Sequence, residues 1–139
     1  MSYKIIGKYI KYLEFKIPNP KTFSLLSKNI SNYKINIDIQ SNQLKEKIIE
    51  VETTLKLVPV KNDSENIITK IIYSSIIELK DGITKKKEIE KIILIKVPSE
   101  IYPELRKIFI FVFENSGFKD IKISNNIDFQ KLYNLKKSQ

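Results

Sequence analysis

The sequence predicts an α+β fold, because strand-like segments fill its first part and helix signals fill its last part. Four segments before residue 80 carry the alternation or apolar runs of strands. Helix start and stop signals then bracket a long apolar span, and a short amphipathic segment follows. The 139 residues, 42% of them hydrophobic, predict a single domain over residues 1–139 with a real core.

The first predicted strand covers residues 8–17. Lys11 interrupts an apolar face that consists of Tyr9, Leu13, Phe15 and Ile17. Pro18 and Pro20 end the strand, because proline lacks the backbone donor that a strand ladder needs. Residues 21–32 show no clean period, and we interpret them as a long ordered connection.

The other three strands are predicted at residues 35–39, 47–58 and 66–79. Ser41-Asn42 predicts a turn after the first of these. Glu50 and Glu52 lie on the polar face of the next one, where we expect them to be exposed and to balance lysines across the sheet. The last one is apolar on both faces and therefore requires cover on both.

A long apolar helix is predicted between Ser99 and Gly117. Ser99 is a favourable N-cap, Pro103 is tolerated in a first turn, and glycine is favoured just beyond a helix end. The apolar residues spread around much of this helix, so it needs partners on more than one side. Because a small sheet covers only one side, we expect subunit association to cover the rest.

Three further segments complete the prediction. Residues 85–95, before the long helix, fit a short helix or a strand equally well. After the long helix, residues 120–124 are strand-like. Residues 128–135 are expected to form a short amphipathic helix.

The composition removes the common catalytic mechanisms. Histidine and cysteine are absent, so triads with these residues and their metal sites are impossible. Three glycines cannot build a phosphate-binding loop. These absences do not exclude carboxylate chemistry, but they predict a protein that needs neither metal nor cofactor.

Charge and hydropathy constrain partners and location. The net charge is +9, but Arg106 is the only arginine, and arginine is the usual reader of phosphates and bases. A solvated lysine surface is the preferred interpretation, and nucleic acid is a less favoured partner. No segment has the length of a membrane helix or the pattern of a secretory signal, so we expect a cytoplasmic protein without stable membrane insertion.

Five short motifs occur in order along nearly the whole chain. They are Tyr9-Ile10-Lys11-Tyr12-Leu13-Glu14-Phe15 with Pro18-Asn19, Ile49-Glu50-Val51, Ile101-Tyr102-Pro103-Glu104-Leu105-Arg106, Ser116-Gly117-Phe118 and Ile127-Asp128-Phe129-Gln130-Lys131-Leu132-Tyr133. They resemble segments of the SecB family. The motif at residues 9–15 with Pro18-Asn19 resembles the first strand with its Pro-Asn turn, and the motif at residues 49–51 resembles the third strand. The motifs at residues 101–106, 116–118 and 127–133 resemble the start of the long helix, the turn after it and the terminal helix.

This resemblance to SecB implies a fold, an assembly and a function. The fold is a four-stranded antiparallel sheet with a long and a short helix, and the assembly is a homotetramer, a dimer of dimers with long helices between sheets. The function is that of a non-enzymatic export chaperone. Such a chaperone wraps unfolded precursor proteins in apolar grooves and passes them to the translocase ATPase SecA.

Three sets of site residues follow. The groove for unfolded clients is predicted at Phe23, Leu25, Leu26, Ile30, Tyr33 and Phe118. The tetramer interface is predicted on one face of the long helix, at Ile101, Leu105, Ile108, Phe109 and Val112. The resemblance places the SecA-docking positions, which are usually acidic in the family, at Tyr12, Lys16 and Lys70. Because the acidic character is missing, SecA docking through this surface stays an open question.

Three alternatives stay open. A lysine-rich RNA-binding module would need exposed aromatic residues among basic residues on one sheet face. A carrier of a small apolar ligand would need a closed cavity within one subunit. A SecB-like chaperone could also be dedicated to a single client, such as an antitoxin.

Overall fold

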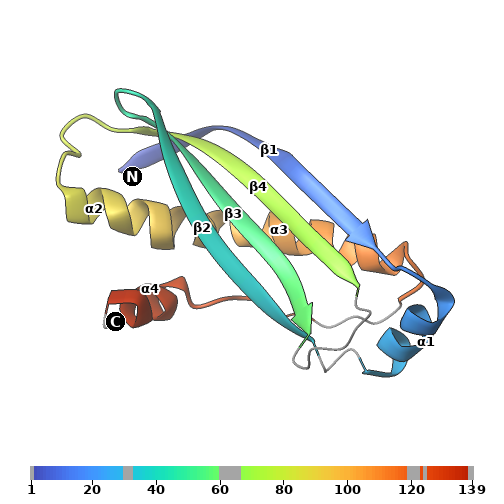
Figure 1. The fold of residues 1–139 in the computed structure, drawn as a ribbon. Helices are drawn as coiled ribbons and strands as arrows, with labels where there is room; N and C mark the ends of the chain where they lie inside the picture. The colour runs from blue at the N-terminus through green and yellow to red at the C-terminus, as the bar shows by residue number, and fades with distance from the viewer. Residues whose placement is uncertain (1, 30–32, 60–66, 119–122, 124, 138–139) are drawn as a thin grey trace.

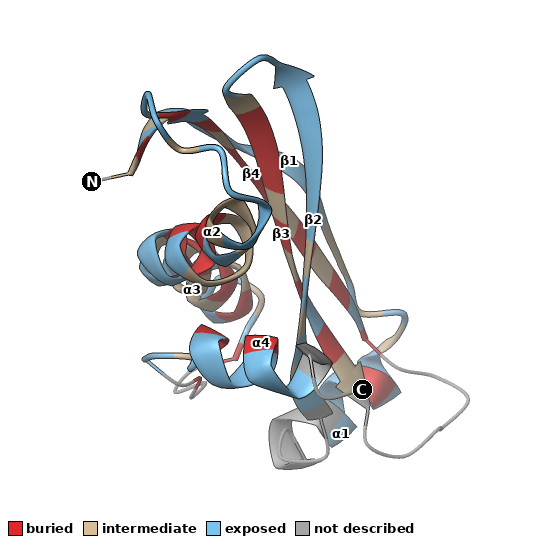
Figure 2. Cartoon of the chain, turned by 90° about the vertical axis from the view of Figure 1, so that its left-hand side faces the viewer, coloured by how far each residue is buried: buried red, intermediate tan, exposed pale blue. Residues whose placement is uncertain are grey.

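The fold is a two-layer arrangement of a sheet and a long helix (Figures 1 and 2). The computed structural model describes residues 2–29, 33–59, 67–118, 123 and 125–137. The antiparallel sheet has the order β1-β4-β3-β2, with β1 at Tyr3–Lys16, β2 at Tyr33–Lys45, β3 at Ile48–Pro59 and β4 at Ile68–Leu79. The helices are α1 at Pro20–Asn29, α2 at Lys86–Lys91, α3 at Val97–Glu114 and α4 at Phe129–Lys137. The predicted α+β fold with a four-stranded antiparallel sheet is confirmed.

The sheet has an inner face, which packs against α3, and an outer face on the opposite side (Figure 2). Most buried side chains belong to the inner face and to the side of α3 that meets it. On β4, the predicted division is confirmed, since Ile71, Tyr73 and Ile77 are buried while Ile72 and Ile76 are partly exposed. Among the described elements, no helix covers the outer face of the sheet.

Strand β1 begins earlier than predicted and changes phase at Lys11. The register with β4 shifts between Ile10 and Tyr12, so Lys11 is the extra residue of a bulge. Tyr9 therefore points to the outer face, where its hydroxyl reaches Glu50, whereas Leu13 lies opposite the buried Ile71. The prediction that Tyr9 shares a face with Leu13 is wrong, because a bulge breaks the period of two.

Strand β2 continues through the turn that was predicted at Ser41-Asn42. These two residues pair with Val51 and Glu50, and β2 ends only at Lys45. The actual turn contains Lys47, whose φ of 68° is in the left-handed region. Polar residues here mark an exposed edge strand and not a turn.

The long helix begins earlier than predicted, and Ser99 does not cap it. Helical backbone runs from α2 through a π-helical turn at Ile92–Lys96 into α3. Ser99 lies inside this helix, where its hydroxyl donates to the carbonyl of Ile95 at 2.6 Å. The π-helical turn lies directly before Pro98, which cannot donate a helical hydrogen bond. The predicted end is confirmed, since Gly117 has a φ of 98° just beyond the helix.

Two short helices flank this core. The connection over residues 21–32 contains helix α1, which was not predicted; Asn19 caps it by accepting a bond from the Thr22 N–H at 2.8 Å. The terminal helix α4 is confirmed, with Asp128 accepting from the Lys131 N–H at 3.0 Å. The strand-like segment predicted at residues 120–124 falls almost wholly outside the described residues.

Candidate functional site

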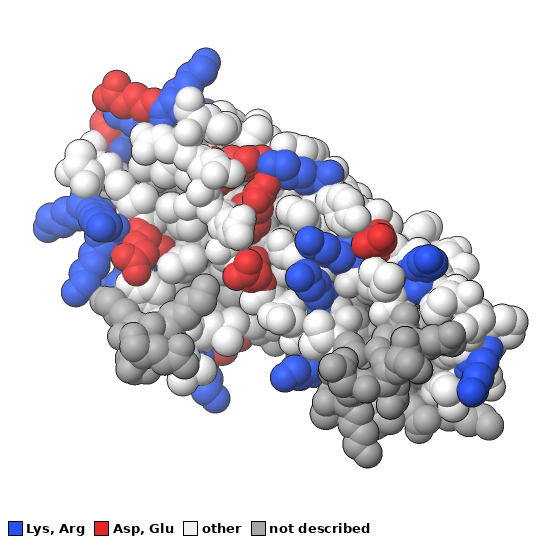
Figure 3. Space-filling view, viewed as in Figure 1, with Lys and Arg blue, Asp and Glu red and all other residues white. Residues whose placement is uncertain are grey.

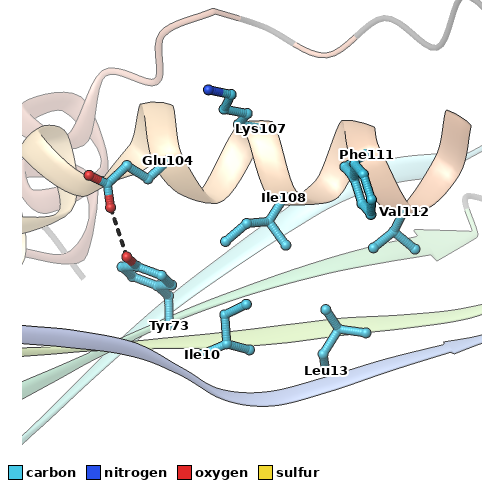
Figure 4. A pocket seen from close by; sticks show the side chains of 8 residues that line it. All are labelled: Ile10, Leu13, Tyr73, Glu104, Lys107, Ile108, Phe111 and Val112. Carbon is cyan, nitrogen blue, oxygen red and sulfur yellow. Dashed lines mark hydrogen bonds between the residues drawn. The ribbon is translucent and has the colours of Figure 1, made fainter. Parts of the chain in front are cut away.

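An apolar groove lies between edge strand β1 and helix α3 (Figure 4). Ile10 and Leu13 point from β1 toward Ile108 and Val112 of α3, and the groove has a volume of about 640 Å³. Phe111 borders it and is 64% exposed. We call this the β1–α3 groove, and its lining consists of Ile10, Leu13, Tyr73, Glu104, Lys107, Ile108, Phe111 and Val112.

One end of the β1–α3 groove is closed by a polar cluster around Glu104. The Tyr73 hydroxyl donates to Glu104 at 2.7 Å, and Lys8 forms an ion pair with the same carboxylate. Lys8 and Tyr73 together lower the pKa of Glu104, while burial and the bond to Glu104 raise the pKa of Tyr73 to about 12. Glu104 and Tyr73 therefore satisfy each other at neutral pH, and the rest of the groove offers mainly apolar surface.

The structure divides the predicted interface residues into two groups. Ile108 and Val112 line the β1–α3 groove and are partly exposed. Ile101, Leu105 and Phe109 are almost completely buried against the chain's own sheet. The second group can support an interface only indirectly, by holding α3 in place. Ile10 and Phe111 are groove residues that the sequence reasoning missed.

The predicted client residues lie around α1 and the end of α3. Phe23 is 36% exposed and packs on the buried Phe118, with 4.9 Å between ring centroids. Leu25 is 50% exposed on the same helix, so α1 presents apolar surface beside a buried aromatic anchor. The other predicted client residues are less informative: Ile30 and the side chains of Leu26 and Tyr33 lie outside the described part of the chain.

A network of hydrogen bonds surrounds Glu50 on the outer face of the sheet. Glu50 is only 7% exposed, which contradicts the prediction of an exposed residue. The Ser74 hydroxyl donates to it at 2.7 Å, and Lys11, Tyr9 and Asn42 contribute longer bonds. The pKa of Glu50 is lowered to about 2, mainly by the Ser74 hydroxyl and also by Lys11, Tyr9 and Asn42, while burial acts in the opposite direction. The predicted balance with a lysine is confirmed, because Lys11 pairs with both Glu50 and Glu52.

We expect Glu50→Gln to lower the free energy of unfolding by about 2 kcal/mol at pH 7, because hydrogen bonds to a buried charge are lost. The pKa of Glu50 is depressed below its usual value, so its stabilisation is present above about pH 4.5 and is lost as the pH falls toward 2. The difference between the two proteins should therefore shrink over this window. Urea unfolding at pH 7, 4 and 3 measures it.

Glu52→Gln is the matched control, since Glu52 accepts from Lys11 alone among the bonds found for it in the described residues. Its effect at pH 7 should be clearly smaller. A Glu50→Gln difference that stayed constant down to pH 3 would show that the carboxylate charge is not the stabilising feature.

The predicted docking residues Tyr12, Lys16 and Lys70 gather on the outer face. Lys70 lies over the Tyr12 ring, 5.7 Å from its centroid, and Lys16 ends strand β1 nearby. An aromatic residue among lysines on one sheet face is also what the RNA-binding alternative requires. The structure brings these three residues together without the acidic character of a SecA-docking surface.

Two further searches concern metals and membranes. Within the described ranges, no group of three or more acidic side chains is placed to hold a metal ion. Likewise, no helix in the described part of the chain is long and apolar enough to cross a membrane.

Comparison with known proteins places the chain in a family. The family described as preprotein translocase subunit SecB matches residues 1–139. A Pelagibacter ubique protein, provisionally named protein-export protein SecB, is 42% identical over 136 residues, which cover 95% of this chain and 94% of the relative. Protein-export protein SecB of Anaplasma phagocytophilum is 26% identical and covers 94% of this chain and 89% of its own length.

Solved structures agree on the fold. A SecB-like chaperone of Mycobacterium tuberculosis, solved in complex with a ChAD peptide from an antitoxin, matches with a TM-score of 0.68. The match covers 91% of this chain and 88% of the other at 8% identity, so it concerns the fold alone. The match over the full length and the close relative together lead to one conclusion: the chain belongs to the SecB family, the chaperones of protein export.

Proposed function

We propose that this chain is an ATP-independent holdase that binds unfolded preproteins and keeps them competent for export. The observation that carries the proposal is the apolar surface of α1, where Phe23 packs on the buried Phe118 and Leu25 is half exposed. Each apolar side chain that a client transfers from water to such a surface gains roughly 1.5–3 kcal/mol. Ordering of the client offsets much of this gain, so many modest contacts along one chain provide the binding.

The proposed assembly is a homotetramer, a dimer of dimers with long helices between sheets. A single chain leaves Ile10, Leu13 and Phe111 exposed along the β1–α3 groove. An apolar surface of this kind on a soluble protein favours association. We propose that a second copy of the chain covers it, which supplies the additional partner that the apolar helix requires.

The remaining parts of the proposal concern the role in the cell. Residues 1–139 act as one domain in the cytoplasm, without catalytic activity or cofactor. The bound client passes onward to the translocase, and SecA is a possible recipient. The lysines at the predicted docking positions argue that any SecA contact here uses a surface of changed sign.

Light scattering of the protein with and without a permanently unfolded apolar protein tests the holdase proposal. A species of about four times 16.3 kDa that gains the mass of the client at moderate salt is the expected result. A monomer that ignores the client would remove both the assembly and the holdase function.

Phe23→Asp is expected to weaken binding of that unfolded protein by about tenfold, because a charge replaces an apolar contact of roughly 1.5–3 kcal/mol. The oligomeric state should not change, since Phe23 lies on α1 and is not among the residues that line the β1–α3 groove. Titration of the labelled client, with light scattering alongside, measures both properties.

Leu44→Asp is the matched control for this variant. Leu44 is also half exposed, but it lies by the turn between β2 and β3, at the opposite end of the sheet from α1 (Figure 1). Its affinity for the client should equal that of the native protein. Unchanged binding by Phe23→Asp would exclude Phe23 from the client surface.

A further inference from the structure

The outer face of the sheet carries two lysines in direct opposition. Lys56 of β3 pairs in register with Lys70 of β4, and side chains of directly paired residues point to the same face. This is the outer face, since the adjacent Leu55 and Ile71 are buried on the inner one. Like charges in such a pair destabilise a sheet, so the arrangement opposes folding. A pair that opposes folding suggests another role.

Two more lysines extend this charge across the sheet. Lys16 pairs with Ile68, two residues from Lys70, and Lys34 pairs with Val58, two residues from Lys56. Diagonal neighbours of this kind lie roughly 7–8 Å apart. Figure 3 shows basic side chains gathered on the half of this face that lies toward α1. We call this set the lysine row, and it consists of Lys16, Lys34, Lys56 and Lys70.

No member of the lysine row forms an ion pair among the described residues. Four ion pairs occur among the described residues, and none of them includes a member of the row. Glu14 pairs in register with Lys70 and also accepts a bond from the Tyr12 hydroxyl, so it offsets part of the charge of Lys70. Asp38, on β2, is a second acidic residue described on this face, and it is exposed. The four lysines outnumber these two carboxylates, so positive charge remains available to a binding partner.

The surface beside the lysine row contains a hollow between strands β2 and β3. It has a volume of about 230 Å³ and is lined by Asn36, Asp38, Thr54 and Lys56 from β2 and β3. The Asn36 amide, the Thr54 hydroxyl and the Lys56 amine are donors that suit a carboxylate. Asp38 accepts bonds and suits a backbone N–H of the same ligand. These four residues fit one polar side chain of a peptide.

We propose that the lysine row and its hollow form a docking surface for an acidic peptide segment of a partner protein. Charge complementarity identifies the partner as an acidic one. Interspersed carboxylates at Glu14 and Asp38 oppose a continuous phosphate backbone, and the row lacks arginine. The proposal does not depend on the holdase function, because the row lies on the outer face while α1 lies beyond the end of the sheet.

Fluorescence anisotropy with a labelled 12-residue Glu-rich peptide tests this docking surface. The native protein should bind this peptide at least tenfold more tightly than a neutral Ser-Gln peptide or a single-stranded oligothymidylate of equal length. Lys56→Gln with Lys70→Gln should weaken the binding at least tenfold.

Lys86→Gln with Lys87→Gln is the matched control, since both lysines are exposed on α2 and the change in net charge is equal. It should bind the acidic peptide as the native protein does. Equal losses in the two double variants would overturn the proposal, because net charge alone would then explain binding. Tighter binding of the oligothymidylate would also overturn it and would favour nucleic acid. If the acidic peptide does not bind at all, the proposal of this docking surface is overturned as well. The client titration tests the holdase proposal separately, so the failures of the two proposals can be told apart.

Discussion

Val112→Lys is expected to dissociate the assembled protein while each chain stays folded. Val112 lines the β1–α3 groove and is partly exposed, so in a single chain the lysine stem can lie along the groove with its amine in water. In the proposed assembly, where a second copy covers the groove, the same amine would be buried without a partner. Such a burial costs several kcal/mol, and a symmetric interface contains it twice. Light scattering should give a mass of one or two chains in place of four.

Asn115→Lys provides the control for this experiment. It adds the same charge near the end of the same helix, but Asn115 is exposed and lies outside the groove. Its mass should equal that of the native protein. Far-ultraviolet circular dichroism should show that both variants keep the native helix content. A fully assembled Val112→Lys protein would show that the β1–α3 groove is not part of the interface.

Phe113→Ala is expected to lower the free energy of unfolding by about 3–5 kcal/mol, a large part of the stability of a small domain. Phe113 is completely buried, and three other aromatic rings pack around it. The nearest is Phe109 at 4.6 Å between centroids, and Phe15 meets it edge-on at 5.0 Å. Because β1, α3 and Phe118 meet at this ring, the cavity has little chance to collapse. The thermal midpoint should fall by roughly 10–20 °C.

Phe111→Ala is the matched control for Phe113→Ala, because it removes an exposed aromatic ring and leaves the core intact. Phe111 lies two residues away on the same helix and is 64% exposed. Its replacement should change the unfolding of a single chain little and should weaken assembly instead. Urea unfolding at several protein concentrations distinguishes the two effects, since only assembly depends on concentration. Equal losses at both positions would contradict the burial pattern of α3.

The strands were predictable wherever one face was buried and the alternation was unbroken. Residues 47–58 and 66–79 correspond closely to β3 and β4. Residues 8–17 gave the right strand with the wrong face for Tyr9, because the bulge at Lys11 inserts one residue. The lysine that interrupts the pattern was the available signal. Bulges depend on pairing with another strand, which a single segment does not reveal.

The candidate sites were predictable only in part, for a related reason. The apolar character of α3 indicated that it needs more cover than one sheet, and the β1–α3 groove agrees with this. Which residues the sheet itself covers could not be predicted, since Leu105 and Val112 look alike in the sequence. Their different burial follows from the angle at which α3 crosses the sheet, which is a property of the whole fold. Helix α1 escaped detection because its face is short and irregular.

The network around Glu50 also determines how the four strands align. Strand β4 is apolar on both faces, so its own pattern would tolerate a shift of one residue against its neighbours. Glu50 on β3 does not tolerate it, because its donors come from β1, β2 and β4. A shift of β3 by one residue would direct the Glu50 carboxylate into the apolar layer below α3, where it would lack hydrogen-bond donors. Glu50 thus specifies the register of the strands and disfavours misaligned sheets during folding. This matters in a chain unusually rich in isoleucine, because many registers would bury similar apolar side chains.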